Sequence, residues 1–194
     1  MELNKNPIVQ FSKWYDEALL KDIEFPEACC LSTISENNYP DGRMVLMKSF
    51  NDDGFVFFTN SKSNKGKHLK KNPRGSLTFY WETLSKQVRI QGNISVISDA
   101  DSDQYFSSRP RGSQIGAWAS LQSKQLCKRN ELDERFVKFE KKYLDVKIPR
   151  PPYWKGYLLK PKRIEFWIGK ENRLHDRFLY EFVNQGWKIN RLYP

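Results

Sequence analysis

Two arginines and one of the chain's two histidines alternate near the C-terminus, in the sequence Arg-Leu-His-Asp-Arg. In an extended segment Arg173, His175 and Arg177 would point to one face, and Leu174 and Asp176 to the other. Guanidinium groups match phosphate or carboxylate, and a histidine beside them can donate or accept a proton. The pattern indicates an anion-binding face. It is equally typical of a solvated hairpin edge with Asp176 as a local ion-pair partner, and these five residues alone do not decide between the two.

Three further segments are rich in groups that bind anions. RMVLMK at 43–48 has a cation at each end, and FFTNSKSNKGK at 57–67 runs from a predicted strand into a predicted helix through hydroxyl, amide and lysine side chains. A helix start of this composition is suited to binding an anion. In YFSSRPRGSQIGAW at 105–118, two arginines flank Pro110. Each segment alone is a weak signal, but together they supply more phosphate-binding groups than one anion requires.

The composition limits the class of protein. The chain has 194 residues, 39% of them hydrophobic, which suits one globular domain with or without an appendage. Its formal net charge of +10 favours nucleic acid, an anionic membrane surface or phosphorylated small molecules, without choosing among them. The three cysteines form neither a disulfide framework nor a zinc pattern, and no apolar run is long enough to span a membrane. We therefore expect a soluble, cytoplasmic protein without a metal site.

Hydrophobic periodicity predicts the elements that must position these side chains. Asp53-Gly54 is a strong hairpin signal, Gly92 indicates a bulge, and an apolar stripe in 131–143 predicts packing in the core or at a subunit interface. The predicted strands are 28–35, 42–50, 55–59, 75–81, 86–98, 154–160, 163–168, 177–183 and 186–192. The predicted helices are 7–22, 63–72, 99–109, 113–120 and 131–143. Because the sequence lacks β-α-β alternation, GxGxxG and a P-loop, side chains must hold most of any bound phosphate.

From about residue 27 to the C-terminus, the sequence resembles the pyridoxine (pyridoxamine) 5′-phosphate oxidases, which are FMN enzymes of the split β-barrel class. The segments RPRGSQIGAW, IEFWIGKENRLHDRFLY and WKINRLYP are specific to that family and occur in the family's order. The resemblance implies a mainly β, antiparallel split barrel with flanking helices. It also implies a homodimer with FMN at the subunit interface, because one subunit of this fold does not enclose FMN.

The implied organisation is one FMN-binding domain over 1–194. It would consist of an N-terminal helix, the first barrel strands, a helical section and C-terminal strands that carry RLHDR. Their respective ranges are 7–22, 27–98, 99–147 and 153–194.

The resemblance implies an FMN site whose residues are carried over from matching family positions. Along the flavin would lie Arg43, Met44, Val45, Leu46, Met47 and Lys48, continued by Phe58 and Thr59. The phosphate would be held by Ser63 and Lys65, with Asn64 between them. Gln87 would reach the flavin ring system, Gln122 and Ser123 would contact FMN from the other subunit's side of a dimer interface, and Trp167 and Arg177 would complete the site.

The same resemblance implies a substrate site and a reaction. The substrate phosphate would be held by Lys48, Tyr105, Arg109 and Ser113, and the pyridine ring side by Arg173, Leu174 and His175. Arg173 and His175 are the predicted catalytic residues, which would orient the reacting C4′ carbon. A hydride would pass from pyridoxine 5′-phosphate or pyridoxamine 5′-phosphate to the flavin. O2 would then reoxidise the flavin, giving H2O2 and pyridoxal 5′-phosphate.

Three features depart from the family pattern. Arg43 and Lys48 are five residues apart, so a regular strand would place them on opposite faces, unless a bulge intervenes or one acts from the strand's end. Asn64 stands where the family usually has a basic residue, with Lys62 as a substitute two residues away. The family often carries an additional N-terminal segment that covers the substrate, and its absence here would affect lid closure and substrate affinity.

Two other interpretations stay open at this point. One is a related split-barrel FMN protein that acts on a different substrate or has no oxidase activity. The other is a nucleic-acid-binding barrel, which would present its basic residues as a stripe with exposed aromatic side chains.

Overall fold

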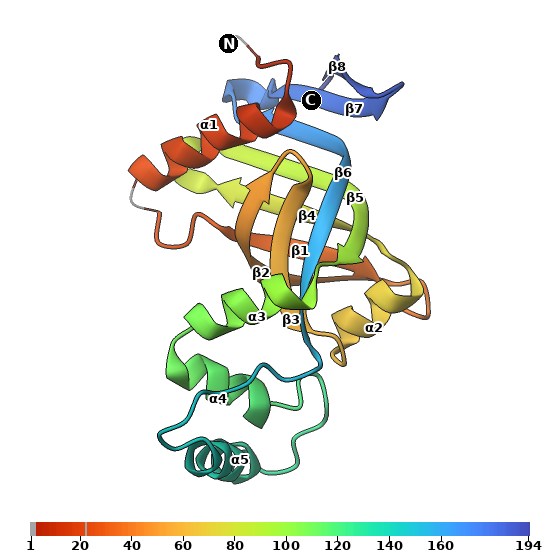
Figure 1. The fold of residues 1–194 in the computed structure, drawn as a ribbon. Coiled ribbons are helices and arrows are strands. Elements are labelled where there is room, and N and C mark those ends of the chain that lie inside the picture. Colours follow the sequence, from red (N-terminus) through yellow and green to blue (C-terminus); the bar gives the residue numbers. More distant parts are fainter. Residues whose placement is uncertain (1–2, 22) are drawn as a thin grey trace.

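The computed structural model describes residues 3–21 and 23–194, and an antiparallel β-barrel with helices at either end forms its centre (Figure 1). The strands are β1 (Ala28–Ile34), β2 (Pro40–Asn51), β3 (Gly54–Asn60), β4 (Arg74–Trp81), β5 (Lys86–Val96), β6 (Trp154–Ile168), β7 (Asp176–Val183) and β8 (Gly186–Leu192). The helices are α1 (Pro7–Leu20), α2 (Asn64–Lys71), α3 (Asp99–Ser108), α4 (Arg111–Ala119) and α5 (Arg129–Lys142). Most predicted bounds agree with these to within two residues. The predicted helix end at residue 22 lies outside the described residues.

The pairing of β3 with β6 closes the sheet into a barrel. The strand order is β3-β2-β1-β4-β5-β6-β7-β8, and the additional β3–β6 pairing joins the first strand to the sixth. All the pairings are antiparallel. Six strands therefore form the barrel, and β7 and β8 extend it as a hairpin. The predicted mainly β antiparallel barrel with flanking helices is confirmed.

One long strand, β6, replaces the two strands predicted at 154–160 and 163–168, so that prediction was wrong. Its first part pairs with β3 and its last part with β7, and β5 pairs with its other edge from Tyr157 to Ile168. Pro161 falls between the β3 and β7 pairings and opposite Gly92, where the register with β5 shifts. A proline is tolerated there because no ladder hydrogen bond is required of it. The predicted irregularity at Gly92 is confirmed, although the extra residue of the bulge is Lys162 on the opposite strand β6.

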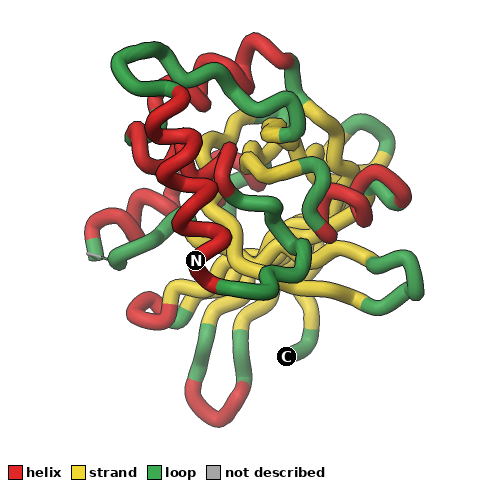
Figure 2. The backbone as a smooth tube through the Cα atoms, turned by 90° about the horizontal axis from the view of Figure 1, so that it is seen from below, coloured by secondary structure: helices red, strands yellow, loops and turns green. Residues whose placement is uncertain are grey.

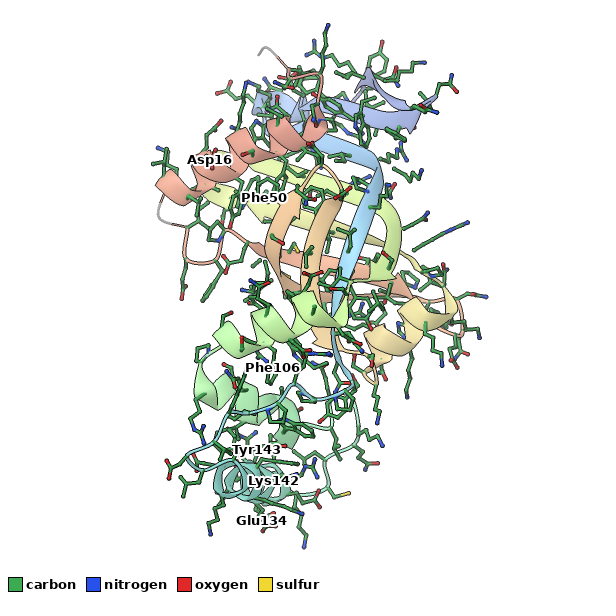
Figure 3. The ribbon with its side chains drawn as sticks, in the orientation of Figure 1. Asp16, Phe50, Phe106, Glu134, Lys142 and Tyr143 are labelled. Atoms are coloured by element: carbon green, nitrogen blue, oxygen red, sulfur yellow. The ribbon has the colours of Figure 1, made fainter. Side chains whose placement is uncertain are left out.

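The main hydrophobic core fills the barrel beneath α1. Asn6 caps this helix, its side-chain oxygen accepting from the N–H of Ile8 at 2.8 Å. Phe11 is fully buried and makes edge contacts with Phe50 and Phe55, each with ring centroids 4.9 Å apart. Figure 3 shows Phe50 at the barrel end that faces α1. Helix α1 therefore closes one end of the barrel with aromatic side chains.

Helices α3, α4 and α5 form a separate layer at the end of the barrel opposite α1 (Figure 1). Figure 2, seen from below, shows helices and loops around the strands. A second core cluster holds this layer together, and it consists of Phe106, Ile115, Tyr143, Ile148 and Trp154. Of the predicted apolar stripe, only Tyr143 is buried; its other members, Leu132, Phe136 and Phe139, are half-buried. Figure 3 places Phe106 and Tyr143 within this layer, whereas Glu134 and Lys142 lie on α5 at its outer surface.

A search of the described residues for helices long and apolar enough to cross a bilayer finds none.

Candidate active site

The predicted site residues separate into two groups within one chain. The helical-end group lies on β2, β3, α2, α3, α4 and the loop after α4, and the hairpin-end group lies on β5, β6, β7 and the turn before β7. Figure 1 shows α3 to α5 at one end of the barrel and the β7–β8 hairpin at the other. The hairpin-end group consists of Gln87, Trp167, Arg173, Leu174, His175 and Arg177.

Strand β2 presents different side chains on its two faces. Arg43, Val45 and Met47 alternate toward the interior, whereas Met44 and Leu46 point outward and are 65% and 39% exposed. The register with β3 shifts between Met47 and Ser49, so the extra residue of the bulge is Lys48 itself. Arg43 is half-buried and Lys48 exposed, so the two lie on opposite faces of β2 although the bulge intervenes.

Arg43 and Lys65 form a cationic centre where β2 meets α2. The guanidinium of Arg43 donates to the Leu31 carbonyl at 3.2 Å and to Thr33 Oγ1 at 2.7 Å, and it pairs with Asp41. Burial lowers the pKa of the Lys65 ammonium, and the neighbouring Arg43 charge lowers it further. Asp41 partly offsets both effects. Two cations beside one carboxylate leave a net positive charge, which fits a bound phosphate.

The loop before α2 is fixed by its own hydrogen bonds. Ser63 is fully buried; its hydroxyl donates to the Asn60 carbonyl at 2.6 Å and accepts from the N–H of Gly66 at 3.3 Å. It therefore caps α2, and its one proton is already used within the loop. A Cβ at Gly66 would lie 2.4 Å from the Ser61 carbonyl oxygen, so only glycine allows this close approach.

The departure at Asn64 leaves no cation at that position. Asn64 is exposed at the start of α2. The Nζ of Lys62 lies 5.2 Å from the centre of the Tyr153 ring, so in this structure its ammonium contacts an aromatic face.

Arg109 lies at the end of α3 with an unpartnered, buried donor. Its guanidinium carbon is 4.9 Å from the centre of the Trp154 ring, and its Nη1 atom is buried without a hydrogen-bond partner among the described residues. Burial lowers the pKa of Arg109. Arg109 and Ser113 line a hollow of about 390 Å³ together with Thr59 and Gln122. An unpartnered guanidinium in a hollow of this size fits a small anion.

A stack of near-parallel rings separates this hollow from its neighbour. Phe58 lies 4.2 Å from Tyr105 and 4.9 Å from Trp154, measured between ring centroids. Lys48 and Tyr105 line the neighbouring hollow of about 540 Å³. The four residues predicted to hold the substrate phosphate therefore lie on both sides of this stack. Trp154, which supports both the stack and Arg109, was missed by the sequence reasoning.

The loop after α4 contributes to the hollow of its own chain. Thr59 Oγ1 donates to Gln122 Oε1 at 3.4 Å, and every residue from 121 to 128 is exposed. Ser123 has a positive φ of 69°. The structure thus places Gln122 beside Thr59 of the same chain, and its contact with FMN from the other subunit's side of a dimer interface stays a prediction.

In the hairpin-end group, three side chains lie in one row across the sheet. Gln87 on β5 is opposite Trp167 on β6, which is opposite Arg177 on β7. The ring of His175 lies 4.7 Å from that of Trp167, and its Nδ1 accepts from the N–H of Lys170 at 3.1 Å. With Nδ1 an acceptor, the proton of the neutral imidazole is on Nε2.

The extended conformation considered for 173–177 is wrong for its first half. Glu171–Arg173 form a 3₁₀ turn, and β7 begins at Asp176. Asn172 and Arg173 have positive φ values of 55° and 62°, which are uncommon for residues other than glycine. Such conformations concentrate at functional sites. The turn leaves Arg173 and Leu174 exposed, so only His175 and Arg177 follow the predicted alternation.

A buried carboxylate beneath Arg177 was also missed. Glu165 is 4% exposed, and it pairs with Arg177 and Arg89. Its only signal in the sequence is a charged residue inside the apolar run 164–168.

Comparisons with known proteins identify the family. Residues 15–146 match the family model described as pyridoxamine 5′-phosphate oxidase, and residues 154–194 match the pyridoxine 5′-phosphate oxidase C-terminal dimerisation region. Relatives named pyridoxine/pyridoxamine 5′-phosphate oxidase include one from Acaryochloris marina, 47% identical over 100% of this chain and 88% of its own length. Another, from Bordetella pertussis, is 50% identical over 97% of this chain and 90% of its own length.

Two solved structures show the same fold. PhzG from Burkholderia lata, in complex with tetrahydrophenazine-1-carboxylic acid, superimposes with a TM-score of 0.94 at 30% identity, covering 100% of this chain and 95% of its own. A pyridoxamine 5′-phosphate oxidase-related, FMN binding protein from Nostoc punctiforme gives a TM-score of 0.77 at 16% identity, with both chains covered completely. The chain described here belongs to the pyridoxamine 5′-phosphate oxidase family and is an oxidoreductase of that kind.

Proposed function

We propose that this protein oxidises pyridoxine 5′-phosphate or pyridoxamine 5′-phosphate to pyridoxal 5′-phosphate, with FMN as its cofactor and O2 reduced to H2O2. The observation that carries the proposal is the presence of two cationic centres in one chain, Arg43 with Lys65 and, separately, Arg109. A phosphorylated cofactor that reacts with a phosphorylated substrate requires two such centres. The chain would act as one FMN-binding domain.

Arg43 and Lys65 would hold the phosphate of FMN, and α2 would direct its N-terminus toward it. Bound FMN supplies the capacity to accept two electrons from a substrate carbon and to pass them to O2. The outer face of β2 offers Met44 and Leu46 to a flat apolar ring. Val45 faces inward, so it would contribute backbone groups.

A second subunit would complete the site. The region matched by the C-terminal dimerisation model begins at residue 154 and contains the hairpin-end group apart from Gln87. Within one chain the β7–β8 hairpin lies at the opposite end of the barrel from α2, which carries Lys65 (Figure 1). We therefore propose a homodimer in which the hairpin-end group of one subunit faces the helical-end group of the other.

The chain's own side chains would bind and orient the substrate. Arg109 and Ser113, with Lys48 and Tyr105 from across the ring stack, would hold its phosphate, and His175 and Arg173 would orient the C4′ end. Because its Nδ1 accepts from the Lys170 N–H, His175 in its neutral form donates from Nε2. His175 would therefore act as a hydrogen-bond donor to the substrate rather than as a base. Fixing both ends of the substrate supplies the orientation that the reaction needs.

The similarity to PhzG favours a second candidate function. The protein from Burkholderia lata is 30% identical and was crystallised with a tricyclic carboxylic acid. A carboxylate could also bind the unpartnered guanidinium of Arg109. The second candidate is therefore oxidation of a reduced tricyclic carboxylic acid.

A visible spectrum of the purified protein under anaerobic conditions tests the proposal. We expect flavin absorption that bleaches when pyridoxamine 5′-phosphate is added and returns when air is admitted. Pyridoxamine without its phosphate is the matched control and should bleach the flavin far more slowly. A flavin that stays oxidised with the phosphorylated amine but is reduced by a dihydrophenazine carboxylate would establish the second function instead. A colourless preparation that does not take up FMN would refute both.

A further inference from the structure

We propose that Glu165 is a positioning residue, which holds the guanidinium of Arg177 in place for the cofactor. The inference rests on the proposed function, in which Arg177 contacts FMN. Glu165 is on β6 between Ile164 and Phe166, both of which belong to the barrel core. Side chains alternate along a strand, so the carboxylate lies on the outer face of the sheet, with Gln87 and Trp167.

The carboxylate sits beneath two arginines that shield it from solvent. Its Oε1 accepts from Arg177 Nε at 2.8 Å, and its Oε2 is 3.2 Å from Arg89 Nη2. The Glu165 side chain is 5% exposed, against 27% for Arg177 and 42% for Arg89. Both oxygens are engaged and buried, so Glu165 is not placed to take a proton from a substrate. Glu165 can therefore affect the reaction only by positioning one of the two arginines that it contacts.

Arg177 is fixed by two contacts and keeps one nitrogen available. Nε donates to Glu165, and Nη1 donates to the Tyr193 carbonyl at 3.0 Å. No hydrogen bond of Nη2 is found among residues 3–21 and 23–194. A guanidinium with two nitrogens anchored presents the third in a defined direction, and its planar fork loses little further freedom on binding.

The balance of charge around Glu165 keeps this face cationic. One carboxylate between two guanidiniums leaves a formal charge of +1, so Glu165 anchors Arg177 without cancelling the attraction to an anionic cofactor. Arg163 and Glu181 form a comparable pair further along the same strands, 3.7 Å apart, but both side chains are at least 40% exposed. The Glu165 carboxylate is buried whereas that of Glu181 is exposed, which distinguishes the pair of Glu165 and Arg177 from an ordinary surface ion pair.

The test is a double-mutant cycle on FMN affinity, measured with full-length apoprotein by the quenching of FMN fluorescence. We expect Glu165→Gln to weaken FMN binding about 10-fold and Arg177→Met to weaken it at least as much. The double variant should bind no more weakly than Arg177→Met alone, because Glu165 acts through Arg177. Glu181→Gln is the matched control on the same face and should leave the dissociation constant unchanged.

Three outcomes would overturn the inference. An unchanged dissociation constant for Glu165→Gln would show that Arg177 needs no anchor. Independent, additive losses in the double variant would show that Glu165 acts only on the general stability of the fold. An unchanged constant for Arg177→Met would remove that residue from the FMN site, and with it the proposed completion of the site by β7, while leaving the spectral test of the reaction unaffected. Should Glu165→Gln not fold, Glu165→Asp, which keeps the charge, serves in the same cycle.

Discussion

Two half-buried arginines in the helical layer allow a direct test of the substrate site. The three kinds of guanidinium nitrogen in Arg150 are all engaged: Nε with Asp103 at 2.6 Å, Nη2 with Asp99 at 2.8 Å, and Nη1 with the Trp154 carbonyl at 2.6 Å. Arg109 has a buried Nη1 without a partner. We predict that Arg109→Met will weaken substrate binding with little loss of stability, whereas Arg150→Met will lower stability with little effect on substrate binding. Methionine keeps the apolar stem of either arginine.

The magnitudes follow from these contacts. Arg109→Met removes an unsatisfied buried donor, worth about 1–3 kcal/mol, and loses a cation–π contact with Trp154, worth about 0.5–2 kcal/mol. These terms oppose each other, so the free energy of unfolding should change by between a loss of about 1 kcal/mol and a gain of about 2.5 kcal/mol. Arg150→Met breaks three charged hydrogen bonds, but both carboxylates are mostly exposed and regain water, which reduces the expected loss to about 1–3 kcal/mol.

Substrate binding should be weakened by Arg109→Met much more than by Arg150→Met, the reverse of the expected losses in stability. Loss of one charged contact with a phosphate costs about 1.5–3 kcal/mol, which corresponds to roughly a 10- to 150-fold increase in KM for Arg109→Met. Arg150 is turned toward α3 and its own connector, so its replacement should change KM by less than about 3-fold. Urea unfolding and steady-state kinetics with pyridoxamine 5′-phosphate measure both quantities. An Arg109→Met protein that is destabilised by more than about 2 kcal/mol and keeps its KM would show that Arg109 is structural, and would refute the reasoning.

Three further predictions follow from the packing. Gly66→Ala should weaken FMN binding and destabilise the fold by about 1–3 kcal/mol, because the new methyl group meets the backbone of the preceding loop; FMN titration and urea unfolding measure this. Phe11→Ala should cost about 3–5 kcal/mol in urea unfolding, since the side chain is fully buried. In the native protein a thiol reagent at pH 8 should modify exposed Cys127 and spare Cys29, because burial raises the pKa of the Cys29 thiol to about 12 and keeps it protonated; rapid labelling of Cys29 would contradict this.

Local signals in the sequence predict most of the barrel but not its connections. The Gly54 turn has a φ of 141°, which the Asp-Gly pair supplies without strain, and Gly92 marks a real shift of register. The sequence analysis predicts separate strands at 154–160 and 163–168, with a break around Pro161. The break is absent because β6 exchanges one neighbour for another at that residue, and this depends on closure of the barrel. Closure is a long-range property that local periodicity does not contain.

The candidate site shows the same limit. The alternation of side chains places Arg43 and Lys48 on opposite faces from the sequence alone, and the structure agrees. The engagement of the Ser63 hydroxyl by the Asn60 carbonyl, and the anchoring of Arg177 by a glutamate on another strand, could not be predicted. Both contacts depend on how the side chains of neighbouring segments are arranged in space. A sequence motif gives only the residue types, not this arrangement.

The distribution of unpaired charge bears on what kind of anion the protein binds. Burying a cation without an ion-pair partner lowers the stability of the fold, and Arg150, which pairs with two carboxylates, shows the usual arrangement. The binding of an anionic ligand must offset the stability lost at each unpaired cation. Lys65 is buried and Arg109 half-buried, and neither forms an ion pair at 4.0 Å or less within the described part of the chain. Each lies at a confined position, behind the α2 loop or in the hollow beside Trp154. A nucleic-acid surface would instead expose a continuous basic stripe to a long backbone. Two confined, unpaired cations are suited to two compact phosphate groups, and this argues against the nucleic-acid interpretation that the net charge alone permits.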